Sequence, residues 1–388
     1  MGALTRLIVT SSFFALVPAY SQDNQLAAVR PRTLRASPAC TACQIQMRKV
    51  ATLASNEFEV ETVQLAVARN SAGILLVGGK NGTIGIFGQS GKLLRVFGRR
   101  GAGPGEFQSI WQIYIGRLDS VFVYDLYARR ITVLDPELKR AVRTFNFNDH
   151  RGWVALMNGS FLTSGSIATV RNSGLSLHLV SPEGNVLQSA GADSAVFRGQ
   201  PMRRLSRSLA PLSDGSVIAA PTHRYRLEQW TAALNLTQVF ERNVDWFPPV
   251  PEGLILDIPS RSPLPMQLMS VTSSGRDGIV ITGLLSGSRN FKPDPALSGR
   301  TGEISVRESG SGPSLNTYVD TTIEFIDLKS ASILATGRYP GFYLPINQAS
   351  VSGRSALYCI AREATDGEHF LEIVEFHLDD KGRLNPRL

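Results

Sequence analysis

Short apolar runs separated by turn residues recur along the chain from about residue 58 to residue 378. Within many runs apolar and polar side chains alternate, as at residues 84–87 and 131–134. An alternation with a period of two is typical of a β-strand whose successive side chains face opposite sides of a sheet. Between these runs we find no convincing apolar stripe with the 3.6-residue period of a helix. The pattern therefore predicts an all-β protein.

Two turns mark each repeat of the pattern. The first turn precedes six apolar runs, at residues 74–77, 121–124, 160–163, 216–219, 279–282 and 355–358. In four cases glycine closes this turn after Ala, Asn or Asp, and glycine tolerates the positive φ that tight hairpins require. The second turn lies at residues 89–92, 135–138, 181–184, 233–235, 327–329 and 379–382.

Six units of four strands predict a six-bladed β-propeller of antiparallel blades. The expected blades span residues 58–98, 107–147, 151–191, 202–246, 266–339 and 342–378. An alternating stretch at residues 45–53 precedes the first blade, and we expect it to pair with the last blade as its outermost strand. That pairing would close the ring and cover sheet edges that otherwise promote aggregation.

The first residues have the pattern of a secretory signal. Arg6 supplies a positive charge, residues 7–17 are apolar, and Ala19 and Ser21 are small residues before an expected cleavage at Gln22. The apolar run is shorter than the ~20 residues that span a bilayer, and no later segment is long enough to do so. The predicted organisation is a signal peptide at 1–21, a polar lead-in at 22–44 and a propeller at 45–388, exported to the periplasm or the cell exterior.

Three cysteines accompany this signal: Cys40, Cys43 and Cys359. The Cys40–Cys43 spacing lacks the following His of a haem attachment site, a second pair for structural zinc, and the βαβ context of a thioredoxin. The remaining interpretations are a local disulfide between Cys40 and Cys43 or an inert pair of thiols, and export would favour oxidation to the disulfide. Cys359 lies in an apolar run and is expected to be a buried thiol.

Residues 96–107 have the sequence VFGRRGAGPGEF. This segment resembles the interblade junction of NHL-like six-bladed propellers, in which a Phe-Gly pair precedes a GxGPGEF loop. The lead-in with Cys40 and Cys43 and the strand after it are also similar to exported bacterial members of that group. The resemblance covers most of residues 40–385 in rhythm but is sharp only at 95–135. It implies the fold and says little about a ligand.

The formal net charge is +8, and basic residues occur singly or in pairs. In a propeller, loops between the second and third strands and loops between blades share one face. Twelve arginines fall in those predicted loops: Arg99, Arg100, Arg129, Arg130, Arg151, Arg203, Arg204, Arg224, Arg226, Arg289, Arg338 and Arg362. Aromatic residues lie among them: Trp111, Tyr127, Trp153, Tyr225 and Trp246.

Guanidinium groups with aromatic rings favour an anionic ligand, such as an acidic glycan or a carboxylate-bearing peptide, or another envelope protein. The predicted ligand-binding residues are Arg99, Arg100, Trp111, Tyr127, Arg129, Arg130, Arg224, Arg226 and Arg362. Alternatively, these arginines form ion pairs with neighbours such as Glu106, Asp125 and Asp149. The expected export argues against nucleic acid, so no nucleic-acid partner is predicted.

No Walker A loop, HExxH motif or nucleophile elbow occurs in the sequence. His150, His223 and His369 fall on predicted loops of the same face and are the candidate ligands for a metal site. Our prediction is a non-enzymatic binding propeller without a cofactor. A metal-dependent lyase or hydrolase and a structural partner in an envelope assembly are the alternatives. Two long loops, 243–265 and 287–316, are predicted to be functional flaps or disordered insertions.

Overall fold

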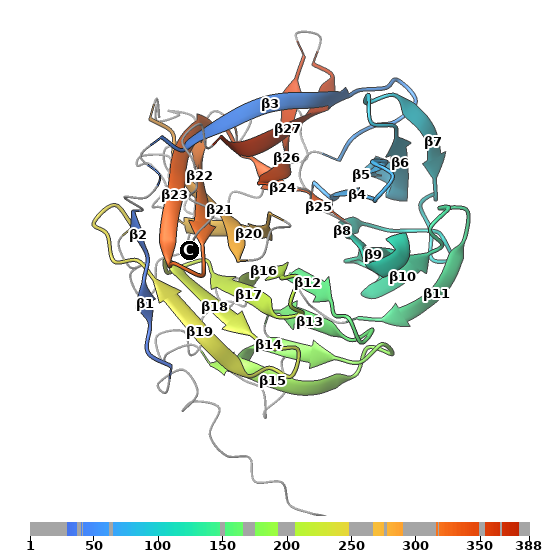
Figure 1. Ribbon diagram of the computed structural model, residues 1–388. Helices are drawn as coiled ribbons and strands as arrows, with labels where there is room; N and C mark the ends of the chain where they lie inside the picture. Colours follow the sequence, from blue (N-terminus) through green and yellow to red (C-terminus); the bar gives the residue numbers. More distant parts are fainter. Residues whose placement is uncertain are drawn as a thin grey trace, which may run out of the picture.

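The computed structural model describes residues 29–36, 40, 42–61, 65–147, 152–165, 175–192, 206–247, 267–274, 278–289, 316, 318–348, 354–364 and 367–379. Within these ranges the chain forms six small sheets arranged around a central axis (Figure 1). The fold is a six-bladed β-propeller, as the repeat predicted. Apart from strands, the described residues form short 3-10 turns such as η2 (Lys80–Gly82) and η3 (Arg117–Asp119).

The blades follow one another along the chain, and each runs from an inner to an outer strand. Blade 1 contains β4 (Val67–Arg69), β5 (Leu75–Gly79), β6 (Thr83–Phe87) and β7 (Leu93–Phe97). Blade 2 contains β8 (Ile110–Ile115), β9 (Val121–Asp125), β10 (Arg130–Leu134) and β11 (Ala141–Asn146). Blade 3 contains β12 (Gly152–Ala155), β13 (Phe161–Ser164), β14 (Leu175–Val180) and β15 (Val186–Ala192).

The second half of the ring has the same plan, and blades 5 and 6 contain the longest strands. Blade 4 contains β16 (Arg207–Pro211), β17 (Val217–Pro221), β18 (Arg226–Trp230) and β19 (Leu236–Glu241). Blade 5 contains β20 (Gln267–Ser273), β21 (Ile279–Gly287), β22 (Val319–Asp327) and β23 (Ser332–Pro340). Blade 6 contains β24 (Leu344–Pro345), β26 (Ser355–Glu363), β27 (His369–Asp379) and β3 (Gln44–Leu53).

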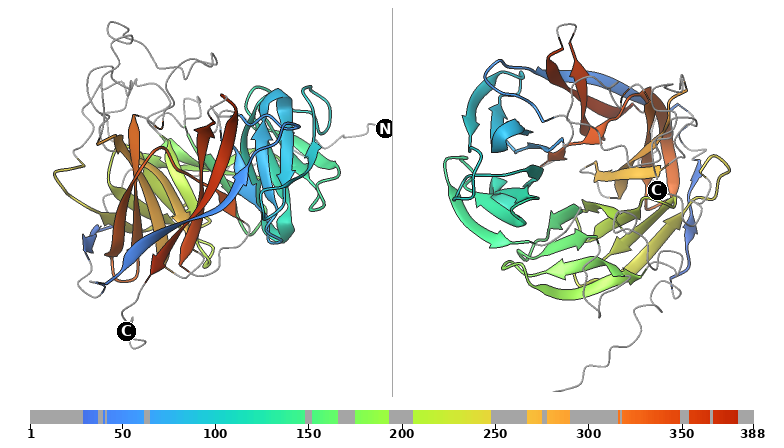
Figure 2. Two further views of the ribbon diagram at one scale, coloured as in Figure 1. Left: turned by 90° about the horizontal axis from the view of Figure 1, so that it is seen from above. Right: turned by 180° about the vertical axis from the view of Figure 1, so that it is seen from behind.

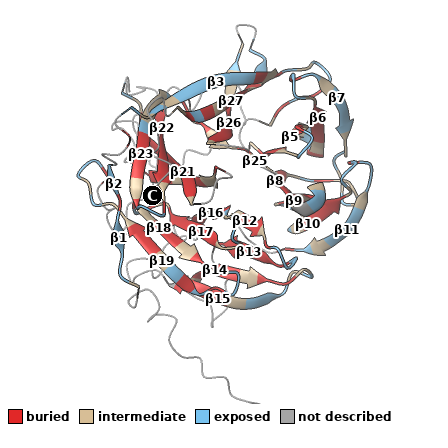
Figure 3. Ribbon diagram, in the orientation of Figure 1, coloured by how far each residue is buried: buried red, intermediate tan, exposed pale blue. Residues whose placement is uncertain are grey.

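The core lies between adjacent blades. All six apolar runs used to align the repeat coincide with the second strands, and β5, β17 and β21 are buried at every position. The outer strands β7 and β11 are mostly exposed, so burial falls from the inner to the outer side of the ring (Figure 3). Second strands give the clearest sequence signal because neighbouring blades cover both of their faces.

The N-terminal strand β3 closes the ring. It pairs antiparallel with β27, from Leu53 opposite Leu371 to Gln44 opposite Asp379. Its last residues, Ala51 and Leu53, are buried in the core between blades 6 and 1. The predicted closure by residues 45–53 is confirmed: a segment from the start of the chain completes the blade formed by its end (Figure 2).

The lead-in also contributes strands that were not predicted. The short strands β1 (Arg32–Thr33) and β2 (Arg35–Ala36) add in parallel to β19 and β23, the outer strands of blades 4 and 5. Between them, Leu34 is buried in the core shared by those blades. We call residues 32–36 the strap, because they join blades 4 and 5 on the outside of the ring before the chain reaches blade 6.

Candidate functional site

The innermost strands surround a cavity of about 1010 Å³ at the centre of the ring. Strands β8, β12, β16 and β20 contribute its walls, together with residues 342–348 of blade 6. That last segment includes β25 (Asn347–Gln348), which pairs in parallel with β4 of blade 1. The volume lies at the upper end of the usual range for small-molecule sites. We treat this central cavity as the candidate functional site.

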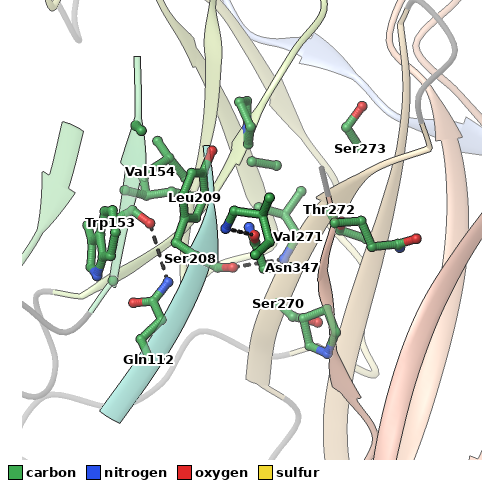
Figure 4. A pocket seen from close by; sticks show the side chains of 18 of the residues that line it. Gln112, Trp153, Val154, Ser208, Leu209, Ser270, Val271, Thr272, Ser273 and Asn347 are labelled. Atoms are coloured by element: carbon green, nitrogen blue, oxygen red, sulfur yellow. Dashed lines mark hydrogen bonds between the residues drawn. The ribbon is translucent and has the colours of Figure 1, made fainter. Parts of the chain in front are cut away.

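Two sides of the cavity differ in chemistry. Blades 2 and 3 contribute aromatic side chains to the lining: Trp111, Tyr114, Phe122 and Trp153. Blades 4 and 5 contribute hydroxyl groups: Ser206, Ser208, Ser213, Thr222, Ser270, Thr272 and Ser273. Figure 4 shows Gln112 and Trp153 on one side, with Ser270, Thr272 and Ser273 on the other. The walls thus offer stacking surfaces and neutral hydrogen-bonding groups.

The charged side chain in the described lining, Arg207, is neutralised within the fold. Its Nε lies 3.1 Å from a carboxylate oxygen of Glu228, and both side chains are at most 2% exposed. Glu228 also accepts hydrogen bonds from Arg226 Nε and from the indole Nε1 of Trp230. The guanidinium of Arg207 therefore belongs to a buried ion-pair network rather than to the surface of the cavity.

Hydrogen bonds between neighbouring blades hold the cavity wall. The backbone N–H of Val271 donates to Ser208 Oγ at 2.9 Å, and that of Ile115 donates to Asn347 Oδ1 at 2.7 Å (Figure 4). The Gln112 side chain donates to the carbonyl of Trp153. Because β8, β12 and β20 are the last strands on the inner side of their sheets, these side chains satisfy backbone groups that would otherwise be unpaired.

The arginines predicted to form an anion site are largely engaged with the protein. Arg99 forms an ion pair with Glu106, whose pKa is lowered by a hydrogen bond from the Gly103 backbone and by the Arg99 guanidinium. Arg130 donates to the carbonyl oxygens of Ala102, Gly103 and Glu106. Both arginines therefore hold the glycine-rich junction between blades 1 and 2 in place.

The same holds further around the ring. Arg226 pairs with Glu228 and Glu241, and Arg362 pairs with Glu372. Arg338 pairs with Asp320 and also donates to the Gly287 carbonyl. Asp125 instead accepts hydrogen bonds from the backbone N–H groups of Gln108, Ser109 and Ala128.

Arg100, Arg129 and Arg224 are exposed. Arg100 and Arg129 have no ion pair with any residue in the described ranges. Tyr127, in the same turn as Arg129, is 68% exposed. Arg151, Arg203, Arg204 and Asp149 lie outside the described residues.

The predicted aromatic residues separate into different environments. Trp111 lies in β8 and lines the cavity, whereas Trp246 is 41% exposed on the loop after β19. Tyr225 is buried between blades 4 and 5, where its hydroxyl donates to Glu324. Arg242 binds the same carboxylate and lies over the rings of Tyr225 and Trp246. This cluster joins two blades by a fully buried carboxylate.

Two of the three candidate metal-binding histidines lie in the described part of the chain. His223 is buried in the loop between β17 and β18, and His369 is the exposed first residue of β27. His150 lies outside the described residues. Within the described ranges, no three His, Cys, Asp or Glu residues are grouped so that they could hold a metal ion.

His178 in β14 is expected to make the stability of the protein depend on pH. It is fully buried, with Nδ1 2.8 Å from Ser189 Oγ and Nε2 3.0 Å from the Gly165 carbonyl. The carbonyl only accepts, so Nε2 carries the proton, and burial lowers the pKa of the imidazole to about 4.

The unfolded chain therefore binds a proton at His178 between pH 6.5 and 4 that the folded protein does not bind. We expect stability to fall as the pH drops through this window, by about 3 kcal/mol in total at ~1.4 kcal/mol per pKa unit. Urea unfolding at pH 7 and pH 4.5 should show a smaller pH dependence for His178→Gln. The exposed His377→Gln variant is the control, and equal pH dependence in wild type and His178→Gln would contradict this role.

Cys359 is a free thiol buried in β26, as the sequence predicted. Burial raises the pKa of this thiol to about 12, so it is unreactive at neutral pH. Cys40 and Cys43 form a disulfide in the structure, with their Cα atoms 5.2 Å apart. The signal segment 1–21 lies outside the described residues.

Sequence reasoning missed the hydroxyl side of the cavity. Ser208, Ser270 and Thr272 lie on inner strands that have no apolar alternation strong enough to mark them. The signal available was positional, because each lies in the strand before a blade's first turn. Which side chains of those strands line the cavity depends on the tilt of each blade.

Comparisons with known proteins support the fold alone. No family model matches the chain. A search of curated proteins finds no relative. Among solved structures, a candidate exported protein of Bacteroides fragilis is similar, with a TM-score of 0.55 and 10% identity over 90% of this chain and 99% of that chain. At this identity the similarity shows a shared propeller fold.

Two further structures are less similar. Virginiamycin B lyase of Staphylococcus aureus gives a TM-score of 0.41 at 10% identity, covering 85% of this chain and 99% of that chain. A PQQ-bound aldose sugar dehydrogenase of Streptomyces coelicolor gives 0.46 at 15% identity, covering 89% of this chain and all of that chain. Within the described residues, no helix has the length and hydropathy to cross a membrane.

Proposed function

We propose that this protein is an exported binding propeller that takes its ligand in the central cavity. The observation that carries the proposal is the lining: hydroxyl, amide and aromatic groups on five blades, around a volume of about 1010 Å³. Such groups hydrogen bond and stack, and hydrogen bonds between blades fix them before a ligand arrives. A wall that is already ordered lowers the entropy cost of binding.

Export is supported by the signal-like residues 1–21 and by the likeness to a candidate exported protein. The glycine-rich junction at residues 98–107 supports placing the chain with NHL-like propellers. In this junction Gly98 and Gly105 have positive φ, and Glu106 accepts the Gly103 N–H. These glycines therefore serve the turn and are not a phosphate-binding loop.

Filling the cavity tests the proposal. Thr272→Trp places a large ring against the inner wall, and Thr237→Trp places the same ring on the exposed outer strand β19. A fragment library of neutral, acidic and basic compounds, screened by ligand-observed NMR, should give hits that Thr272→Trp removes and Thr237→Trp keeps. Hits that survive the filled cavity, or a library without hits, would overturn the proposal.

A second candidate function is anion binding by Arg100, Tyr127 and Arg129, exposed residues of blades 1 and 2 that we together name the exposed basic patch. Its specific support is that both arginines are exposed without an ion pair to any described residue. Of the arginines predicted to bind an anion, Arg100 and Arg129 are therefore the ones on which this second candidate function rests. An acidic glycan or a carboxylate-bearing peptide remains the ligand class it would favour.

Heparin chromatography tests this patch. The double variant Arg100→Gln, Arg129→Gln should elute at lower salt than wild type, because fewer cations contact the polyanion and salt screens those that remain. The variant Arg140→Gln, Arg143→Gln removes the same charge from the other side of blade 2 and should elute later than the first variant. Equal elution of the two variants would show that only net charge matters.

A further inference from the structure

We infer that the ligand of the central cavity is an uncharged saccharide, bound with one ring face against Trp111 and its hydroxyl groups toward blades 4 and 5. This inference deepens the proposed function and rests on it. It adds the chemical class of the ligand and the orientation in which the cavity would hold it.

The charge of the lining favours a neutral ligand. Arg207 is the charged side chain of the described lining, and Glu228 already neutralises it at 3.1 Å. Burying a carboxylate, a phosphate or an ammonium group among hydroxyls and amides would leave it without an opposite charge, which is unfavourable. The cavity therefore differs from the exposed basic patch, which would select an anion.

The two sides of the cavity match the two kinds of surface on a sugar ring. Trp111 and Phe122 line the blade 2 side and are partly exposed, so a ring can present its C–H face to them. Ser208, Thr272 and Ser273 lie on the blade 4 and 5 side and are also partly exposed. Each Ser or Thr hydroxyl both donates and accepts, as sugar hydroxyl groups require of their partners.

The inner strand edges are less suited to an extended peptide. A peptide would bind such an edge by adding a strand and pairing with its free N–H and C=O groups. Here the N–H groups of Val271 and Ile115 and the carbonyl of Trp153 are already bonded to side chains of neighbouring blades. The edge that strand addition would need is therefore partly occupied at three points of the wall.

The volume also indicates an oligomer of the sugar. A cavity of about 1010 Å³ is at the upper end of the range for small-molecule ligands. The wall hydroxyls lie at different heights along the axis, because Ser206 precedes β16, Ser213 follows it, and Ser270, Thr272 and Ser273 lie from the middle to the end of β20. One sugar ring would reach only part of this set.

The test uses three probes with the full exported chain: cellotetraose as the neutral saccharide, tetragalacturonate as its acidic counterpart, and capped tetra-alanine as the uncharged peptide. Binding is measured by titration calorimetry and saturation-transfer NMR. Trp111→Ala removes the stacking ring, and Trp111→Phe retains a ring if the first variant is unstable. Trp246→Ala removes an exposed tryptophan outside the cavity and serves as the matched control.

We expect cellotetraose to bind, with affinity about three- to ten-fold weaker in Trp111→Ala and near the wild-type value in Trp111→Phe and Trp246→Ala. Thr272→Val should weaken binding about two- to ten-fold, because it deletes one hydroxyl at nearly constant shape. The matched Thr237→Val variant on the outer strand should bind as wild type does.

Tighter binding of tetragalacturonate or tetra-alanine than of cellotetraose, lost in Thr272→Trp, would overturn the inference of an uncharged saccharide and leave the cavity as a binding site. If Trp111→Ala and Thr272→Trp both bind cellotetraose with the wild-type affinity, the sugar binds outside the cavity and the inference is overturned. The proposed function itself fails only if the fragment screen also finds no compound that the filled cavity excludes.

Discussion

A chain that lacks residues 22–54 should fail to form a stable propeller. The deletion removes β3, which completes blade 6, and the strap, which adds edge strands to blades 4 and 5. It exposes the edge of β27 that paired with β3, and it removes Ala51 and Leu53 from the core between blades 6 and 1. We expect a loss of more than ~5 kcal/mol, which is comparable with the whole stability of many proteins. Circular dichroism during urea unfolding would measure it.

Two smaller changes separate the causes. A chain that lacks only residues 22–28 retains every described strand and should unfold like the full chain. Leu53→Ala retains the backbone pairing of β3 and removes one fully buried side chain, which should cost about 2–5 kcal/mol. A melting temperature unchanged by the deletion of 22–54 would show that the ring does not depend on its N-terminal strand.

Glu228→Ala should destabilise the protein by about 3–5 kcal/mol, because it removes a carboxylate that pairs with the buried Arg207 guanidinium. Both partners are at most 2% exposed, and the same carboxylate also binds Arg226 and Trp230. Chemical unfolding of the purified variant gives the free energy of unfolding directly. Glu137→Ala, which breaks an exposed ion pair with Lys139, should cost less than about 1 kcal/mol.

The double variant Arg207→Met, Glu228→Leu checks the cause. If Glu228→Ala is destabilising because the buried Arg207 charge loses its partner, removing both charges should restore part of the lost stability. Apolar residues of similar volume can often replace a buried ion pair without loss of stability. Restoration would be partial, because Trp230 still loses its hydrogen-bond acceptor. A double variant less stable than Glu228→Ala would mean that packing, and not charge, sets the cost.

Local sequence features predicted most of the ring. The six apolar runs became the second strands of the six blades, and their turns recur where Gly73, Gly159, Gly215 and Gly278 have positive φ. The strap was missed because residues 32–36 contain only two apolar residues, Leu34 and Ala36, which are too few to mark a strand. Their strand conformation exists only where the outer edges of β19 and β23 supply hydrogen-bonding partners.

The sequence determined by itself that this chain is all-β, repeats in six units and closes its ring with residues 45–53, because alternation and turn glycines are local properties. It also placed twelve arginines in predicted loops of one face, although the structure has Arg130, Arg226, Arg338 and Arg362 in strands β10, β18, β23 and β26. Only the tertiary structure decided what those arginines do: Arg99, Arg226, Arg338 and Arg362 bind carboxylates of the protein itself. Likewise only the ring brings the aromatic side of blades 2 and 3 to the hydroxyl side of blades 4 and 5. Ion pairing and cavity lining depend on which side chains meet across blades distant in sequence, and no local pattern encodes that meeting.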